Sequence, residues 1–270
     1  MRSLWFGVLV CAAMLVACGD DDSDFMTRPS DGSSSSVCED CDDGSSSSAK
    51  SSSSSAKSSS SATLANPCKT DSTDTCEYGE LIDDRDGQTY KTVKIGDQWW
   101  MAENLNYEVD SSFCYNDSAE YCEKFGRLYR WAATVGKSES ECGYGYTCSL
   151  PSGDVQGVCP SGWHLPSRAE WETLFNAVGG QSTAGKVLKS TSEWYDNGNG
   201  TDVFGFSALP AGLSYRNGGF NYEGYNVTFW SSTESNSNSA YRMYLYYTSD
   251  NANQSNDYKN YGYSVRCLKD

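Results

Sequence analysis

CPSGWHLPSRAEWETLF, residues 159–175, indicates more about how this chain folds than any other stretch. Ser167 and Glu170 have the spacing of a capping box, in which a hydroxyl and a carboxylate accept the first free amides of a helix. Gly179 supplies a helix end. Between them, apolar residues recur at helical spacing: Trp171, Leu174, Phe175 and Val178. The stretch therefore predicts an amphipathic helix with Ser167 at its N-cap.

His164 lies just before this helix and is the only histidine in the chain. A catalytic histidine needs an orienting carboxylate and a nucleophile within hydrogen-bond reach. Glu170 and Glu172 are the nearby carboxylates, but the helix cap already employs Glu170, and no G-x-S-x-G motif is present. We therefore predict a packing role for His164 and no catalytic residues.

The chain on both sides of this helix predicts an α+β domain. Residues 79–107 alternate apolar and polar residues between Asp/Gly turns, which predicts a three-stranded meander. Residues 126–136 and 183–190 have helical spacing, and residues 139–162 have the composition of a loop. From Phe204 onward, short apolar stretches between Asn, Gly and Ser predict further strands. The expected fold has twisted antiparallel sheets, two or three helices and stabilising disulfides.

Residues 1–17 are predicted to be a lipoprotein signal peptide, with Arg2 at its positive start and an apolar segment after it. LVAC, residues 15–18, resembles the bacterial lipobox, which predicts lipidation of Cys18 and a membrane anchor through buried acyl chains. An ordinary signal peptide without a role for Cys18 is the alternative. The protein is thus expected to be exported and held at the outer membrane or cell surface.

Residues 18–66 are almost all Ser with Asp, Gly and Lys, and they lack the apolar residues that a core requires. This segment predicts a disordered, Ser-rich tether. Cys38 and Cys41 within it have the spacing of a metal or redox pair, but no second pair follows, so a local disulfide is the favoured interpretation. Residues 67–270 are left as one domain.

The composition of the chain restricts its partners. The formal net charge of −16 and a pI near 4.4 argue against nucleic acid and against an anionic membrane surface. The 19 Tyr, 8 Trp and 9 Phe residues suit half-buried strands, and they also suit stacking on sugar rings.

Twelve cysteines, less Cys11 in the signal and Cys18 at the lipid site, leave an even number in an exported protein. This predicts a disulfide framework. Nearness in sequence suggests Cys38–Cys41 and three further local pairs, which leaves Cys159 to pair with Cys267. The further local pairs are Cys68–Cys76, Cys114–Cys122 and Cys142–Cys148. Spacing alone does not fix this connectivity, so the pairing is a hypothesis.

Six blocks occur in order: DGQTYKTVKIGDQWWMAENLNY, GRLYRWAA, CPSGWHLPSRAEWETL, GNGTDVFGFSALPAG, FWSSTE and YGYSVRCLKD. Together, over about residues 78–270, they resemble the Fibrobacter succinogenes major paralogous domain, a family of exported bacterial proteins. More distantly, they are similar to the C-type-lectin-like fold of formylglycine-generating enzymes. In that fold the N- and C-terminal strands lie together, which fits a Cys159–Cys267 bond. The enzymes need a copper-binding cysteine pair near the domain end, whereas this chain offers only Cys267 there.

Two groups of candidate binding residues remain. YDNGNGTD, residues 195–202, offers oxygen ligands for Ca²⁺, although a plain Asn/Gly turn explains it as well. Those ligands are Asp196, Asn197, Asn199 and Asp202. The sugar-binding motifs of C-type lectins are missing, so for polysaccharide we select the aromatic residues Tyr215, Tyr222 and Tyr225, with packing in a sheet as their alternative role.

These features favour a non-enzymatic surface lipoprotein that displays a binding or adhesion domain on a tether, with plant polysaccharide as a candidate ligand. A scaffold that binds other envelope proteins is the second hypothesis. An enzyme with the formylglycine-generating fold is the third. No cofactor other than Ca²⁺ is expected.

Overall fold

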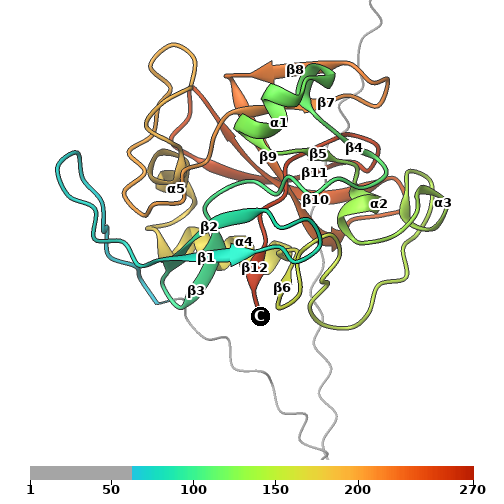
Figure 1. Ribbon diagram of the computed structural model, residues 1–270, viewed down its shortest axis with the longest axis horizontal. Helices are drawn as coiled ribbons and strands as arrows, with labels where there is room; N and C mark the ends of the chain where they lie inside the picture. The colour runs from blue at the N-terminus through green and yellow to red at the C-terminus, as the bar shows by residue number, and fades with distance from the viewer. Residues whose placement is uncertain (1–62) are drawn as a thin grey trace, which may run out of the picture. The chain divides into compact units, whose positions relative to one another are not determined.

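The computed structural model describes residues 63–270, and Figure 1 shows their arrangement. The predicted meander is confirmed: β1 (Tyr78–Ile82), β2 (Thr89–Ile95) and β3 (Gln98–Met101) pair in sequence as antiparallel neighbours. Thr89, Lys91 and Lys94 of β2 are exposed, and the alternation of burial breaks in the middle of the strand, where Thr92 and Val93 are both buried. None of the described helices is long and apolar enough to cross a membrane.

The C-terminal strand joins this meander to the segment that begins at residue 159. β12 (Leu268–Lys269) lies between β3 and β6 (Trp163–His164), so the first sheet has the order β1-β2-β3-β12-β6. Leu268 pairs with Trp100 on one side and with His164 on the other. The end of the chain is thereby built into the sheet next to the helix that follows His164 (Figure 1).

The second sheet has the order β11-β10-β9-β7-β8. Its strands are β7 (Ala211–Ser214), β8 (Phe220–Glu223), β9 (Asn226–Glu234), β10 (Ser239–Tyr246) and β11 (Ala252–Tyr258). The expectation of purely antiparallel sheets is wrong at one place, because β7 and β9 pair in parallel. The hairpin of β7 and β8 places β8 on the outside, so the chain returns to β7 in its original direction. A two-stranded sheet of β4 (Ser112–Phe113) and β5 (Leu128–Tyr129) completes the strands.

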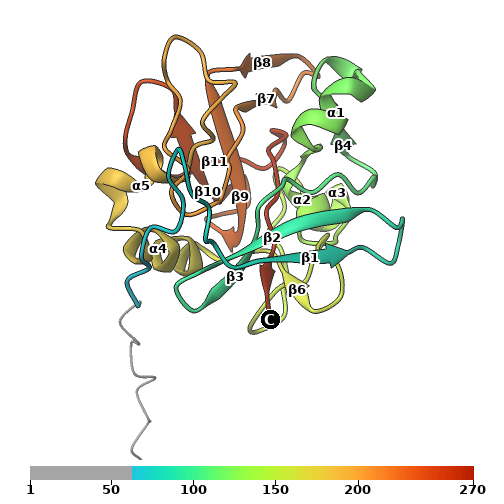
Figure 2. The ribbon, with the colours of Figure 1, turned by 60° about the vertical axis from the view of Figure 1, so that its left-hand side comes forward.

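The described residues contain five short α-helices, more than the two or three expected. They are α1 (Ala119–Phe125), α2 (Trp131–Thr134), α3 (Glu139–Cys142), α4 (Arg168–Ala177) and α5 (Gln181–Leu188), with a 3₁₀ turn at Tyr115–Asp117. The missed helices α1 and α3 are a few residues long and show little apolar periodicity. Each carries a disulfide cysteine, which ties it to a neighbouring loop. Figure 2 shows α4 and α5 beside the second sheet.

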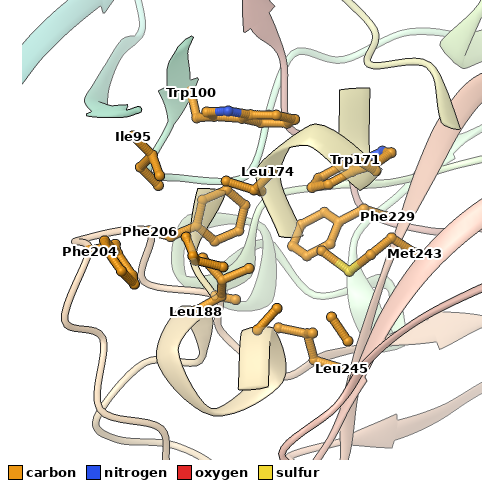
Figure 3. Packing of buried hydrophobic residues seen from close by; sticks show 14 of the residues in the cluster. Ile95, Trp100, Trp171, Leu174, Leu188, Phe204, Phe206, Phe229, Met243 and Leu245 are labelled. Atoms are coloured by element: carbon orange, nitrogen blue, oxygen red, sulfur yellow. The ribbon is translucent and has the colours of Figure 1, made fainter. Parts of the chain in front are cut away.

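Helix α4 begins as the sequence predicts. Ser167 Oγ accepts the amide of Glu170 at 3.3 Å, and Glu170 Oε2 accepts the amide of Ser167 at 2.8 Å. The apolar face of α4 packs into an aromatic core between the two sheets (Figure 3). Trp171 of this face lies 4.8 Å from Trp100 of β3 and 5.6 Å from Phe229 of β9, measured between ring centroids. The helix therefore links both sheets.

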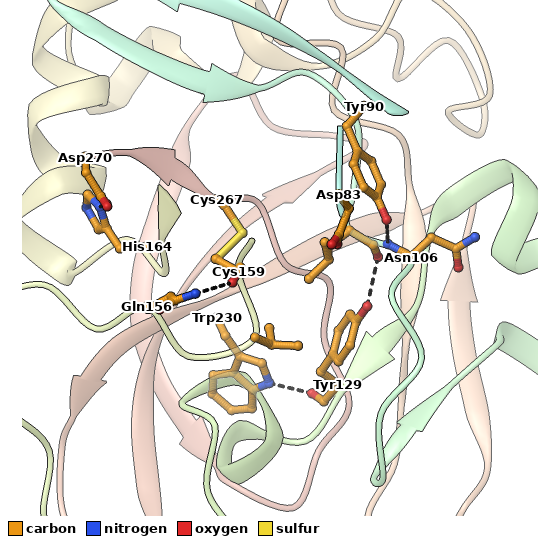
Figure 4. Close-up of a disulfide and its surroundings, with 12 residues drawn as sticks. Asp83, Tyr90, Asn106, Tyr129, Gln156, Cys159, His164, Trp230, Cys267 and Asp270 are labelled. Carbon is orange, nitrogen blue, oxygen red and sulfur yellow. Dashed lines mark hydrogen bonds and ion pairs between the residues drawn. A yellow bond between two sulfur atoms is a disulfide. The ribbon is translucent and has the colours of Figure 1, made fainter. Parts of the chain in front are cut away.

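Four disulfides stabilise the described residues: Cys68–Cys76, Cys114–Cys122, Cys142–Cys148 and Cys159–Cys267. These are the pairs expected from the sequence. Cys159 and Cys267 are fully buried and join residues 108 positions apart (Figure 4). Cys18 and the pair Cys38–Cys41 lie outside the described residues, as do the predicted signal peptide and most of the predicted tether.

Candidate functional site

The three candidate tyrosines belong to two separate clusters. Tyr225, in the turn between β8 and β9, stacks on Tyr195 with a centroid distance of 4.5 Å and an angle of 24° between the rings. Tyr247 meets both rings edge-on, at 5.7 Å from Tyr195 and 5.3 Å from Tyr225, and it also contacts Tyr246. We call these four residues the tyrosine platform. Its outermost ring, Tyr195, is 52% exposed.

Backbone hydrogen bonds hold the platform together from three segments. The amide of Tyr195 donates to Gly224 O at 2.8 Å, and the amide of Tyr247 donates to Tyr225 O at 2.9 Å. Gly198 allows the loop after Tyr195 to approach β10 closely, because a Cβ there would lie 2.6 Å from the Cβ of Tyr247. The rings are therefore positioned before any ligand arrives, which limits the entropy lost on binding.

Tyr215 and Tyr222 belong to a different cluster, the tyrosine ladder, at the other side of β7 and β8. Tyr215 lies beside Tyr222 and meets Tyr261 edge-on at 5.7 Å. Tyr261 stacks between Tyr258 and Tyr263, with ring angles of 14° and 13°. Because Tyr263 is buried, the ladder runs from the core to the surface. Packing thus accounts for Tyr215, while Tyr222 and Tyr258 keep exposed ring surface.

The residues selected for Ca²⁺ mostly have other contacts. Asp202 is buried, and its carboxylate accepts Lys69 Nζ at 2.6 Å and the Ser207 hydroxyl at 2.7 Å. Asn199 Oδ1 accepts the amide of Trp194 at 3.1 Å. Asp196 and Asn197 are exposed and adopt positive φ angles, as turn residues do. Calcium binding by this loop stays a prediction.

DDRDG, residues 83–87, forms the first of the expected Asp/Gly turns, between β1 and β2. Asp83 is buried and accepts two hydrogen bonds from the Arg85 guanidinium, at 2.7 and 2.6 Å. Burial opposes ionisation of Asp83, but these bonds outweigh it and lower the pKa of the carboxyl. Arg85 also lies over the Tyr107 ring at 3.8 Å, so the turn is fixed against the rest of the domain.

His164 sits between two carboxylates. Its Nδ1 lies 2.7 Å from Asp270 Oδ1 (Figure 4). Its Nε2 lies 3.0 Å from Glu170 Oε1, and Asp154 is close by. Burial alone would lower the pKa of His164, but the bonds to Glu170 and Asp270 prevail and raise it to about 9. The ring is therefore a protonated donor at neutral pH, with both nitrogens engaged. It ties the C-terminal residue to the start of α4.

Comparison with known proteins places most of this structure in one family. Residues 93–269 match the model described as the Fibrobacter succinogenes major domain. The chain belongs to this family. The resemblance drawn from the six sequence blocks is thereby confirmed. Neither a curated protein nor a solved structure matches the chain.

In this member of the Fibrobacter succinogenes major domain family, two buried lysines bind groups from distant parts of the chain. Lys259 is fully buried, donates to Tyr146 O at 2.7 Å and to Glu234, and lies over the Trp131 ring. Lys189 is also buried and donates to three backbone carbonyls at the end of β10. Burial lowers the pKa of Lys189. The ammonium groups of both lysines are hydrogen-bonded within the protein, so both residues have a structural role.

The sequence did not single out Tyr195, Tyr246 or Tyr247 of the platform. Tyr195 stands at the first position of the stretch interpreted as a calcium loop, and Tyr247 ends a run of alternating residues interpreted as a strand. No periodicity relates them to Tyr225, because three separate segments bring the rings together. The one available signal was the high tyrosine content between residues 195 and 247.

Proposed function

We propose that this protein is a non-catalytic surface lipoprotein whose disulfide-bonded domain binds polysaccharide through the tyrosine platform. The observation that carries the proposal is the stack of Tyr195 on Tyr225, which is held by backbone hydrogen bonds and exposes Tyr195 by 52%. A ring held in this way offers a flat apolar face beside a hydroxyl, and such faces suit the C–H faces of sugar rings.

Two features of residues 63–270 support a role without catalysis. All eight cysteines of this region are in disulfides, so none of them supplies the free thiols that formylglycine-generating chemistry requires. The sole histidine has both ring nitrogens bonded to carboxylates. A protonated imidazole in that position is a poor general base.

We also propose that the domain has a C-type-lectin-like fold. The support is the position of the C-terminal strand β12 between β3 and β6, together with the Cys159–Cys267 bond beside it. Display at the cell surface is part of the same proposal, and its support is the lipobox-like LVAC segment and the Ser-rich stretch before the domain.

The test is a depletion assay with insoluble cellulose and xylan, using the purified full chain. Tyr195→Ala removes the exposed ring, and we expect its affinity for the insoluble polymer to fall about fivefold, which corresponds to roughly 1 kcal/mol for one aromatic contact. Tyr146→Ala is the matched control, because Tyr146 is 51% exposed and lies outside the platform. We expect it to bind as the native chain does.

Two results would contradict the proposal. If the native chain stays in the supernatant with both polymers, the domain does not bind these polysaccharides, and the envelope-protein scaffold becomes the better hypothesis. If Tyr195→Ala and Tyr146→Ala bind equally well, the platform is not the binding surface.

A further inference from the structure

A groove with polar walls runs past strand β2, and none of the tyrosines of the platform or the ladder lines it. Its central hollow has a volume of about 440 Å³ and lies between β2, residues 102–106, the end of α1 and the loop of residues 190–209. A second hollow of about 380 Å³ shares Gln88, Asn106 and Glu123 with it. A third, of about 490 Å³, shares Thr89, Lys91 and Glu103. Neighbouring hollows therefore share walls, and we call the three together the polar groove.

The base of the polar groove is buried and tightly hydrogen-bonded. Asn104 is 7% exposed and donates to Phe125 O at 2.7 Å, while Arg266 behind it donates to Asn104 Oδ1 at 2.7 Å. Asp202, 2% exposed, accepts the amide and hydroxyl of Ser207. Such a base keeps its shape when a ligand enters, because each of these groups already has its partners.

Acidic groups outnumber basic ones along the groove. Lys69 Nζ lies 2.6 Å from Asp202 Oδ2, Arg127 lies 2.6 Å from Glu108, and Lys124 pairs with Glu193. The walls also carry four carboxylates that form no ion pair among the described residues, from Glu80, Asp86, Glu103 and Glu123, whereas Lys91 is the one such cation there. This excess of carboxylates disfavours an anionic ligand. Carboxylates accept hydrogen bonds from ligand hydroxyls, and Gln88, Thr89, Ser190, Thr191 and Ser192 add uncharged hydroxyl and amide groups, so the walls suit a neutral ligand with many hydrogen-bonding groups.

One acceptor in the groove has no partner in the protein. Asn106 borders both the central and the second hollow, and its Oδ1 is buried without a hydrogen bond. Its backbone is held in place, because its amide donates to the Tyr90 hydroxyl at 3.1 Å (Figure 4). An unpaired buried acceptor is unfavourable, and a turn of the Asn106 side chain that brings Oδ1 to a ligand hydroxyl in the groove would relieve this cost.

We propose that the polar groove is a second carbohydrate site, which binds a single neutral oligosaccharide chain in extended form. This inference rests on the proposed polysaccharide binding and adds a site that the platform does not contain. The platform offers a face to insoluble material, whereas the groove encloses one free chain. Because the three hollows follow one another, a longer oligosaccharide makes more contacts, and its affinity rises with chain length.

The test is calorimetric titration of the full chain with soluble neutral probes: cellohexaose, xylohexaose and mannohexaose, with cellobiose as the short probe. We expect at least one hexaose to bind, and the disaccharide to bind at least about tenfold more weakly because it fills one hollow. Hexagalacturonate is the anionic probe and is expected to bind more weakly than the neutral hexaose.

Two variants assign the binding to the groove. Ser192→Trp places a large ring into the central hollow from an exposed position, and hexaose affinity is expected to fall at least about tenfold. Thr89→Val removes one wall hydroxyl at nearly constant volume, with an expected loss of about two- to tenfold. Ser255→Trp, at an exposed position of β11, is the matched control and should leave affinity unchanged. Unaltered thermal melts confirm that the variants fold.

The two sites fail in different ways. If no neutral hexaose binds, if hexagalacturonate binds best, or if Ser192→Trp keeps its hexaose affinity, the groove proposal is wrong whatever the platform does. If Tyr195→Ala still binds insoluble polymer as the native chain does while Ser192→Trp loses the hexaose, the groove stands and the platform is wrong. If the groove is a separate site, Tyr195→Ala should bind the soluble hexaose with the same affinity as the native chain.

Discussion

Arg266 donates its Nε–H to Asn104 Oδ1 over 2.7 Å, although the two residues are 162 positions apart in the chain. Arg266 is 1% exposed, and its other N–H groups donate to the carbonyls of Met101, Phe206 and Ser207. Burial lowers the pKa of Arg266 to about 9, which leaves the guanidinium charged at neutral pH. One side chain from the C-terminal segment thereby joins the end of β3 to the loop before β7.

Replacing Arg266 should destabilise the domain strongly. Arg266→Met removes the donor and leaves Asn104 Oδ1 and the buried carbonyls without partners, so we expect the free energy of unfolding to fall by roughly 3–5 kcal/mol. Arg266→Lys keeps the charge but not the planar fork, so it should also destabilise. Urea denaturation measures the free energy of unfolding of both variants. Arg168→Lys, at an exposed position, is the control and should change stability by less than about 0.5 kcal/mol.

Local signals predicted the parts of the fold that depend on neighbouring residues. Ser167 and Glu170 cap α4 as expected, since a capping box needs only its own turn of helix. The meander of β1, β2 and β3 is set by two short turns. Cys159 and Cys267 were paired only because the other cysteines had closer neighbours.

Contacts between distant segments could not be predicted in this way. The parallel pairing of β7 with β9 depends on where β8 is placed. Glu170 was recognised as a cap, but the second carboxylate at His164 comes from Asp270, 106 residues away. The platform and the groove depend equally on tertiary structure, because each is built from three or more segments.

The pH dependence of stability should show the charge on His164. Its pKa in the folded protein, about 9, lies above the ordinary value of 6.5, so the stabilisation is fully present below pH 6.5 and is lost as the pH rises through 9. Burial opposes ionisation of Glu170, but the bond from His164 lowers the pKa of this carboxyl, whose contribution is lost at acidic pH. We therefore expect the free energy of unfolding of the native chain to exceed that of His164→Gln by on the order of 2–3 kcal/mol near pH 6.

Urea unfolding of both proteins at pH 6, 8 and 10 provides the measurement. Taking the difference between the two proteins cancels the titration of groups that they share. The difference in the free energy of unfolding should shrink as the pH rises from 6.5 to 9, so it should be smaller at pH 8 than at pH 6 and nearly absent at pH 10. A difference that grows towards pH 10 would mean that neutral His164 is the stabilising form.

The Cys159–Cys267 bond should contribute more to stability than the short disulfides. It closes a loop of 108 residues, for which chain entropy gives about 4–5 kcal/mol, whereas Cys142–Cys148 closes one of 6 residues and is worth about 2 kcal/mol. We expect the double Ala variant of the long-range pair to melt well below the double Ala variant of the short pair. Thermal unfolding under non-reducing conditions compares them. Equal melting temperatures would show that the denatured chain gains little freedom when the long loop opens.

Gly198 should contribute to polysaccharide binding even though it offers no side chain to a ligand. A Cβ at this position would lie 2.6 Å from the Cβ and 2.7 Å from the carbonyl oxygen of Tyr247, so Gly198→Ala has to push the loop away from β10. Tyr195 lies on the same loop, and its ring should then separate from Tyr225 and Tyr247. We expect depletion by insoluble polymer to fall about as far as in Tyr195→Ala, roughly fivefold.

The matched control for Gly198→Ala is Gly219→Ala, because Gly219 is exposed and a Cβ there would meet no atom closer than 3.5 Å. This variant should bind insoluble polymer as the native chain does. The native chain, Gly198→Ala and Gly219→Ala should all bind soluble hexaose with the same affinity, since neither glycine lines the polar groove. Loss of hexaose binding in Gly198→Ala would indicate general misfolding, and full retention of polymer binding would show that the arrangement of the platform rings does not matter.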